Sequence, residues 1–280
     1  MRPPVFIPVL LLLCLRVQAG DIPWLEGGHT KLRALASYYP DDSIFREAFG
    51  EWEDSEGAGL RLKFAGDHGR FGLTAHYQLL GQSGDSPDLL QQSSGLLPLS
   101  PRLPDDDRRW WDLTDQVSDS GSHELVQRLD RLHLDYRGDT TVLRFGRQAI
   151  TWGNGLVYSP MDLFNPFDPA AVDTEYKLGD DMLYGQYLLD NGSDWQFVSV
   201  QRRDEDGDVD SRVSSNALKF HGFGLAREFD LLVAEHYDQF ILGAGAIMNL
   251  GEAVLRGDVT FTDAHDGWET SLVANWSYSW

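Results

Sequence analysis

The side chains that most often carry catalysis are dispersed in this chain. Five of its eight histidines, at positions 76, 133, 221, 236 and 265, are scattered over nearly 200 residues. No pair of histidines has the spacing of a metal site, and no Gly-x-Ser-x-Gly segment marks a nucleophilic serine. We therefore expect no catalytic residue, no bound metal and no other cofactor.

One acidic segment has a spacing that could bind a cation. Asp204 to Asp210 places carboxylates at every second position, as a calcium loop does. Its glycine, Gly207, is fourth, whereas an EF-hand loop needs glycine sixth and a glutamate twelfth. The pattern favours a solvated turn, and weak binding of a divalent cation is the alternative.

Most of the chain consists of short segments in which apolar and polar residues alternate, which is the period of a β-strand. The last one places Leu272, Ala274, Trp276, Tyr278 and Trp280 on one face and small polar residues on the other. We predict about twelve strands, at 31–39, 58–65, 70–80, 125–137, 140–149, 182–190, 194–203, 214–225, 229–238, 240–249, 252–262 and 269–280.

The connections between these segments alternate between tight and mostly longer ones, with a short link near Tyr237 as the exception. This alternation is typical of a transmembrane antiparallel up-and-down β-barrel, with short periplasmic turns and long outer loops. Residues 82–121 form the longest predicted extracellular loop. A soluble β-sandwich is the alternative, because it too contains many short alternating strands.

The N-terminus has the features of a signal peptide. Arg2 precedes an apolar run from Val5 to Leu15, and Val17-Gln18-Ala19 suits a signal peptidase. We predict a leader at 1–19 and a mature barrel at 20–280, with 21 basic and 44 acidic residues and a net charge of −23. So acidic a chain is a poor binder of nucleic acid. The expected location is the outer membrane of a Gram-negative bacterium, reached through the barrel-assembly machinery.

Charged residues fall on the polar face of the predicted strands. A charge on the lipid face at mid-membrane costs roughly 2–4 kcal/mol, so these side chains are expected in the lumen. The predicted lumen cations are Arg33, Arg61, Lys63, Arg131, Arg144, Lys219 and Arg256, against Asp135 and Asp258. The excess of cations predicts an anion-attracting interior. The alternative is that they pair with loop carboxylates and fill a small barrel.

Residues 150–181 form a loop rich in proline, glycine and aromatic residues, which cannot continue a strand ladder. Its aromatic residues require burial, so we predict that the loop folds into the barrel mouth as a constriction or a plug. Arg147 and Gln148, at the end of the preceding strand, are expected to hold Asp162, Asn165 or Asp168 by hydrogen bonds. The predicted constriction motif comprises Arg147, Gln148, Trp152, Gly153, Asp162, Asn165, Pro166 and Asp168.

This segment resembles a family of Gram-negative outer-membrane β-barrels of largely undefined function. The shared pattern is a strand ending in Gly-Arg-Gln, then Trp-Gly, then Pro-x-Asp-x-x-Asn-Pro, here at 146–148, 152–153 and 160–166. The resemblance covers about 35 residues. The terminal Trp-Ser-Tyr-Ser-Trp is also similar to the C-terminal assembly signal of outer-membrane proteins. The family is distantly akin to porin-type and alginate-export-type channels, which implies a channel without chemistry.

Three functions remain after the sequence is read. The first is a porin-like channel for passage or export of small anionic or saccharide-like solutes. The second is a non-conducting outer-membrane scaffold, or part of an envelope lipid or polymer transport system with partners in that system. An outer-membrane enzyme is the third and has the least support in the sequence.

Overall fold

The computed structural model describes residues 9–17, 24–43, 46, 50–84, 103–120, 122–167, 176–224 and 227–278. The predicted leader residues 1–8 and 18–19, residues 85–102 of the long loop, and Trp280 lie outside them. Two compact units are present. Unit 1 comprises Met1–Gly66, Ala75–Asp106 and Asp112–Asp130, and unit 2 comprises Asp67–Thr74, Asp107–Trp111 and Arg131–Trp280.

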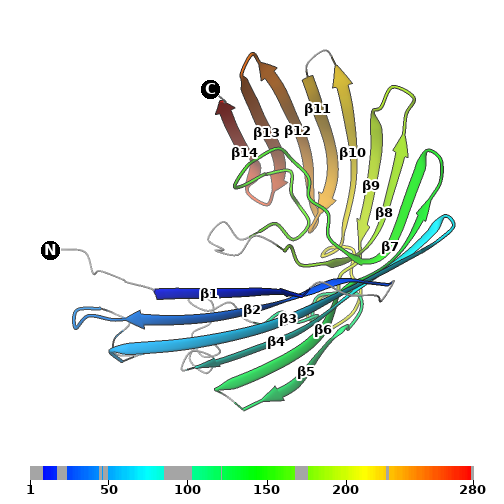
Figure 1. Ribbon diagram of the computed structural model, residues 1–280. Helices are drawn as coiled ribbons and strands as arrows, with labels where there is room; N and C mark the ends of the chain where they lie inside the picture. Colours follow the sequence, from blue (N-terminus) through cyan, green and yellow to red (C-terminus); the bar gives the residue numbers. More distant parts are fainter. Residues whose placement is uncertain are drawn as a thin grey trace. The chain divides into compact units, whose positions relative to one another are not determined.

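Every named element is a β-strand (Figure 1). The strands are β1 (Val9–Val17), β2 (Leu25–Tyr38), β3 (Trp52–His68), β4 (Phe71–Gly84), β5 (Thr114–Asp119), β6 (His123–Arg137), β7 (Thr141–Gln148), β8 (Asp180–Leu188), β9 (Asp194–Val200), β10 (Ser215–Gly224), β11 (Arg227–His236), β12 (Gln239–Leu250), β13 (Ala253–Ala264) and β14 (Gly267–Tyr278). No helix within the described ranges is long and apolar enough to cross a membrane.

Thirteen strands pair in the order β1-β2-β3-β4-β6-β7-β8-β9-β10-β11-β12-β13-β14, and β5 pairs with β6 beside this path. The path is open, ending at β1 and β14. This order confirms the predicted all-β, antiparallel, up-and-down arrangement. All twelve predicted strands are present, within a few residues of their expected bounds except β2 and β3, which begin about six residues early.

Two strands were not predicted. β5 lies within 82–121, which we expected to be loop, because Thr-Asp-Gln-Val-Ser-Asp has no apolar alternation to reveal it. β1 is formed by residues of the predicted leader and pairs with β2 over its whole length. This pairing belongs to the unprocessed chain, and cleavage after Ala19 stays a prediction.

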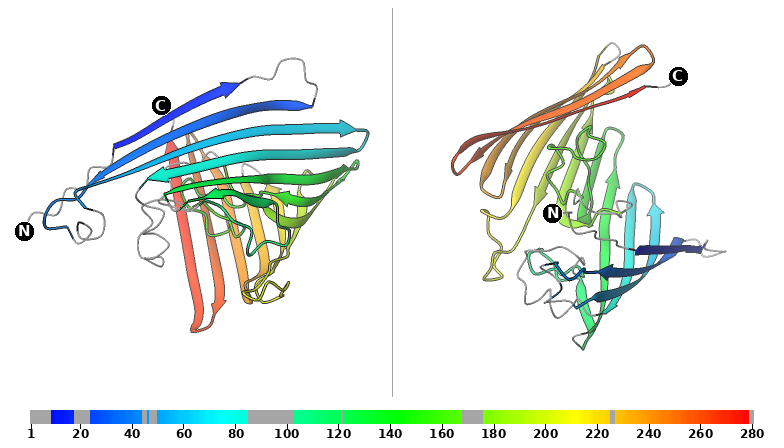
Figure 2. Two further views of the ribbon diagram at one scale, coloured as in Figure 1. Left: turned by 90° about the horizontal axis from the view of Figure 1, so that it is seen from below. Right: turned by 90° about the vertical axis from the view of Figure 1, so that its left-hand side faces the viewer.

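Within unit 2, tight and long connections mostly alternate as expected, but the link between β13 and β14, predicted as a longer loop, consists only of residues 265–266. Residues 138–140, 189–193 and 251–252 join strands at one edge, whereas 149–179 and 201–214 join them at the other. The exception near Tyr237 is also present, because Tyr237 and Asp238 alone connect β11 to β12, both with positive φ. Figure 2 shows strands β7 to β14 side by side in chain order.

The sheet of unit 2 is charged on its covered face and apolar on its open face. On β6, Arg131, His133 and Asp135 are buried, while Leu134 between them is 50% exposed. On β10, Lys219 is buried, while its neighbour Leu218 is exposed. We call the face that carries Asp135 and Lys219 the inner face, and the face that carries Leu134 and Leu218 the outer face. A sheet of a soluble protein has the opposite distribution: its apolar face packs against the core and its polar face is exposed to water.

Gly146, the first residue of the Gly-Arg-Gln pattern, is required by a close approach of two strands. Its φ of +129° lies in a region that residues with a Cβ rarely adopt. A Cβ at this position would also overlap the carbonyl oxygen of Leu132 on β6. Gly185 on β8 is different, because a Cβ there would make only an ordinary contact of 3.5 Å with Leu143.

We predict that Gly146→Ala destabilises the folded protein by about 1–3 kcal/mol, because it adds backbone strain at a forced positive φ. Gly185→Ala, on the strand that pairs with β7, is the matched control and should change stability by less than about 1 kcal/mol. Urea unfolding of the two refolded variants measures both. Equal stabilities would show that β6 and β7 do not approach as closely as described.

Candidate functional site

The connection between β7 and β8 packs onto the inner face of unit 2. We call its described residues 149–167 and 176–179 the motif loop. Met161 and Phe164 are buried, and Trp152 packs edge-on against Phe164 with 5.4 Å between the ring centroids. These side chains join a cluster of inner-face residues from β8 to β12: Met182, Val198, Val200, Ala217, Leu232, Ala234 and Ile241. The loop therefore shares the hydrophobic core of unit 2.

Polar contacts fix Trp152 above the middle of the sheet. Its indole Nε1 donates to the Gln196 side chain on β9 at 2.8 Å. The ammonium of Lys219 lies 5.4 Å from the centre of the indole ring. The site thus brings Trp152 of the predicted motif next to Lys219, one of the predicted lumen cations.

The tip of the motif loop is held by one carboxylate on β13. Asp258 Oδ2 accepts from Asn154 N at 2.7 Å, Gly155 N at 3.2 Å and Ser159 Oγ at 2.9 Å. Its other oxygen accepts from Asn154 Nδ2 at 2.8 Å. Gly245 allows this approach, because a Cβ there would lie 2.7 Å from the Asn154 amide nitrogen. Asp258, expected only as a lumen charge, is therefore the anchor of the loop.

From this anchor the loop reaches the last strand. The backbone nitrogen of Leu156 donates to Asn275 on β14 at 3.1 Å. The tip itself is apolar and open, and Val157 is 80% exposed. The green segment of Figure 1 that runs toward β13 and β14 is this part of the loop.

The base of the loop is held by Lys177, a residue that the sequence analysis did not single out. Its Nζ donates to Asp162 Oδ1 at 2.5 Å and to the Ile150 carbonyl at 2.6 Å. Burial lowers the pKa of Lys177 and raises the pKa of Asp162, and their hydrogen bond only partly offsets both shifts. The pair therefore closes the loop on itself at an electrostatic cost. Arg131 donates to the Lys177 carbonyl and lies over the Tyr176 ring.

Among the described residues, Arg147 binds neither Asp162 nor Asn165 as expected. Its guanidinium binds Asp181 through two hydrogen bonds of 2.8 and 2.9 Å and donates to the Trp111 carbonyl at 2.6 Å. Arg147 is paired across the sheet with Leu132 on one side and Asp181 on the other, so it shares the outer face with Phe145. It points away from the motif loop, because the two-residue strand period sets its face.

The remaining motif residues have mostly backbone roles. Gln148 is on the inner face and donates to the Met182 carbonyl at 3.1 Å, not to the predicted loop acids. Gly153 has φ +92° and Asn165 has φ +48°, so both support tight turns of the loop. Pro166 is exposed. Asp168 lies outside the described residues.

The predicted lumen cations of unit 2 lie on the inner face, and two of them, Arg144 and Lys219, face carboxylates. Arg144 donates to Asp135, and Lys219 Nζ is 3.3 Å from Asp230. Arg256, on β13, donates to Ser277 on β14 at 3.2 Å. The carboxylates that pair with Arg144 and Lys219 lie on neighbouring strands, not in the loops as the alternative interpretation predicts. Strand parity alone could have found Asp230, which is two residues from the inner-facing Leu232.

A second inner-face network was missed entirely. Arg202 donates to Asp180 at 2.7 Å and to Ser215 Oγ at 2.7 Å, and Ser215 Oγ is 2.8 Å from His236 Nδ1. Ser215 has no exposed surface, so no substrate reaches its hydroxyl in this arrangement. The network ties the start of β10 to the ends of β8 and β11.

The three predicted lumen cations of unit 1 lie on β2 and β3. Arg61 is buried and meets the side-chain amide of Gln78. Arg33 lies opposite Gly57. A Cβ at position 57 would lie 3.2 Å from Nη2 of the Arg33 guanidinium, so glycine leaves room for this side chain. Lys63 is partly buried.

The acidic segment forms a turn that is held by hydrogen bonds to Asp204. Asp204 Oδ1 accepts from the backbone nitrogens of Asp206 at 3.0 Å and Asp208 at 3.1 Å. Asp210 pairs with Arg212, which lowers the pKa of that carboxyl. Within the described part of the chain, no group of three or more His, Cys, Asp or Glu residues is arranged to hold a metal ion.

The sequence matches no family model, and no match was found among the curated proteins or the solved structures.

We predict that Asp258→Asn loosens the tip of the motif loop. The substitution replaces one accepting oxygen by a donor and removes the charge from hydrogen bonds that each contribute about 1.5–3 kcal/mol. Amide hydrogen exchange at Asn154 and Gly155 should become about ten- to a hundredfold faster. Asp263→Asn, on the outer face of the same strand, is the control and should leave both amides protected. Unchanged exchange in Asp258→Asn would contradict the anchor.

Proposed function

We propose that the mature chain is a β-barrel of the outer membrane of a Gram-negative bacterium. The observation that carries this proposal is the inverted polarity of unit 2. Its outer face exposes a continuous set of large apolar side chains, including Leu134, Phe145, Leu183, Phe197, Leu218, Leu231, Val233, Leu242, Phe261 and Leu272. Water would penalise so large an apolar surface, whereas lipid accepts it.

The positions of exposed aromatic residues support this placement. Trp268 and Phe240 contact each other near the long-loop edge, while Trp276 and Tyr278 lie near the tight-turn edge of β14. Trp268 and Trp276 are eight residues apart, about 26 Å along a strand. A strand tilted by about 40° then spans roughly 20 Å, close to the apolar band between the two aromatic girdles of such barrels.

The function that best fits this architecture is a narrow, porin-like channel for small anionic or saccharide-like solutes. The motif loop fills the inner face over β8 to β12, where it packs into an apolar core. The inner faces of β13 and β14 instead carry several small polar residues, among them Thr260, Thr262, Ser271, Asn275 and Ser277, together with the charged residues Arg256, Asp258 and Glu269. Such a lining suits the passage of hydrated solutes beside the loop.

A second candidate is a non-conducting scaffold, alone or with partners in envelope lipid or polymer transport. It is favoured by the number of buried ion pairs. Arg144, Lys177 and Lys219 each face a carboxylate, which weakens the cationic field expected from the sequence alone. The chemistry of an outer-membrane enzyme finds no support in the buried Ser215–His236 contact.

The proposed location predicts a depth-dependent cost for outer-face charges. Leu231→Arg places a cation at the middle of β11 and should cost about 2–4 kcal/mol in a bilayer. Glu235→Arg, on the same face near the long-loop edge, should cost about 0–1 kcal/mol. Urea unfolding of both variants in liposomes gives the two values. If Leu231→Arg costs no more than Glu235→Arg, the outer face does not contact lipid.

The proposed channel predicts discrete current steps when the refolded mature chain is inserted in a planar bilayer. Asp258→Asn should increase conductance or its fluctuations, because it releases the loop tip beside the proposed path. Glu235→Arg serves as the control, since its site is on the outer face. A folded, inserted protein that never conducts, with or without Asp258→Asn, would reject the channel and favour the scaffold.

A further inference from the structure

The segment Asp107–Trp111, which we call the rim segment, belongs to unit 2 although it lies between β4 and β5 in sequence. Its backbone runs beside the residues that follow β9. Arg109 forms an antiparallel bridge with Arg202, and the Arg203 nitrogen donates to the Arg108 carbonyl at 3.1 Å. Arg109 Nε donates to the Gly179 carbonyl at 3.0 Å. These contacts hold the segment at the long-loop edge of β8 and β9.

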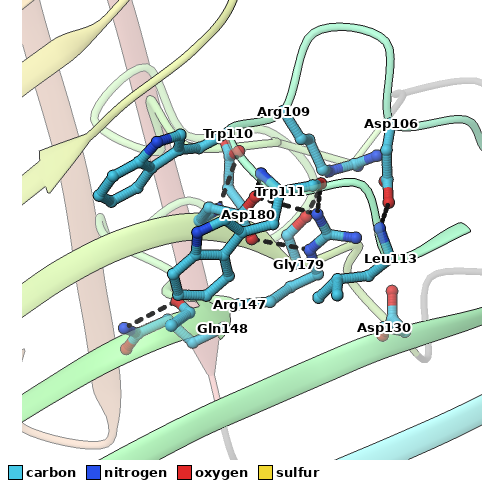
Figure 3. A network of polar contacts seen from close by, with 12 residues as sticks. Asp106, Arg109, Trp110, Trp111, Leu113, Asp130, Arg147, Gln148, Gly179 and Asp180 are labelled. Carbon is cyan, nitrogen blue, oxygen red and sulfur yellow. Dashed lines mark hydrogen bonds and ion pairs between the residues drawn. The ribbon is translucent and has the colours of Figure 1, made fainter. Parts of the chain in front are cut away.

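Beyond Arg109 the rim segment turns onto the outer face. The Trp111 nitrogen donates to Asp181 Oδ2 at 2.8 Å, and its carbonyl accepts from Arg147. The indole of Trp111 packs edge-on against Phe145 with 5.3 Å between the ring centroids. Figure 3 shows Trp111 close to Arg147, with Trp110 next to Trp111. Because Arg147 and Phe145 face outward, both tryptophans lie on the outer wall of the sheet.

The two tryptophans form a compact aromatic pair. Their rings stack at 5.5 Å with an interplanar angle of 22°, and both also contact Phe145. Both indoles are partly exposed, so the pair is not a closed core. The Arg203 guanidinium fixes the backbone by donating to the Trp110 carbonyl at 2.7 Å.

The aromatic pair lies between apolar residues on one side and charged residues on the other. On one side are the exposed Leu134, Phe145 and Leu183 of the outer face. On the other side Arg108 pairs with Glu205 at 3.0 Å, with both side chains exposed to water. An amphipathic ring at such a boundary matches the position of tryptophan at a membrane surface.

The rim segment also stabilises a buried ion pair on the outer face. Arg147 and Asp181 are charged residues on the face that we propose to contact lipid, yet neither has any exposed surface. The rim segment lies against this pair, and the Trp111 backbone donates to Asp181 and accepts from Arg147. Without the rim segment, two charges on the outer wall would carry the penalty of ions exposed to lipid.

We propose that Trp110 and Trp111 anchor the rim segment in the headgroup layer of the bilayer. This inference rests on the membrane location proposed above. The indole rings lie at headgroup depth, Phe145 points to the hydrocarbon side and the Arg108–Glu205 pair points to the aqueous side. The Arg147–Asp181 pair is the fixed support that holds the rings at this depth.

The test is tryptophan fluorescence of the refolded mature chain in phosphatidylcholine vesicles that carry a bromine label near the headgroups or near the bilayer centre. Three variants are compared with the parent chain. Trp110→Phe/Trp111→Phe removes the proposed anchor, Trp276→Phe removes an outer-face ring from the opposite edge, and Trp152→Phe removes the ring buried on the inner face. Trp110→Phe alone is added, because it leaves the Trp111 hydrogen bonds to Asp181 and Arg147 and the Trp111–Phe145 contact in place, and it is expected to fold.

We expect quenching by the headgroup label to fall in both Trp110→Phe/Trp111→Phe and Trp110→Phe. This fall should be at least roughly twofold larger than the fall in quenching by the label at the bilayer centre. Trp152→Phe should leave both unchanged. If Trp276→Phe reduces quenching while the Trp110 and Trp111 variants do not, the anchor is rejected and the membrane location stands. If no label quenches any of these proteins, the membrane location itself is rejected, and the anchor with it.

Discussion

The strict alternation of side chains along each strand is the constraint on which the rest of unit 2 depends. It sends Asp135, Lys219 and Asp258 to one face and Leu134, Leu218 and Val259 to the other. Once one face carries buried charge, each charge needs a partner, because an isolated ion in a covered environment is very costly. The acids of neighbouring strands and the polar backbone of the motif loop supply those partners. The loop is therefore part of the fold as much as part of a candidate site.

The fold was largely predictable from the sequence. A two-residue period is visible in single strands, and Gly, Asn and Asp mark the tight turns, so the strands and the alternation of connections could be read directly. β5 was not predicted because it is short and polar, so its sequence carries no apolar alternation. β1, which falls within the predicted leader, was not predicted, because a run of leucines has no period that distinguishes a strand from a signal peptide.

The site was less predictable, and Arg147 shows why. The motif was read as a unit, so Arg147 and Gln148 were both assigned to the loop that follows them. Adjacent residues of a strand face opposite ways, however, and only Gln148 faces that loop. The partners of Arg147 within the described residues include Asp181, 34 positions away, and Trp111, 36 positions away in the other direction. Lys177 and Asp258 were similarly hidden, because nothing local in the sequence indicates which distant segment a buried charge will meet.

The contact between Asp258 and the motif loop also bears on the order in which the molecule is assembled. Asn154 and Asp258 are separated by 104 positions in the chain, and a contact of that range forms slowly because a long segment must first be ordered. β13 must be in place before the loop tip has anything to bind. The loop is thus a late-closing element that reports whether the C-terminal strands have taken their places. During folding, its aromatic residues stay uncovered until β13 is in place, and the chain is most exposed to misassembly in this interval.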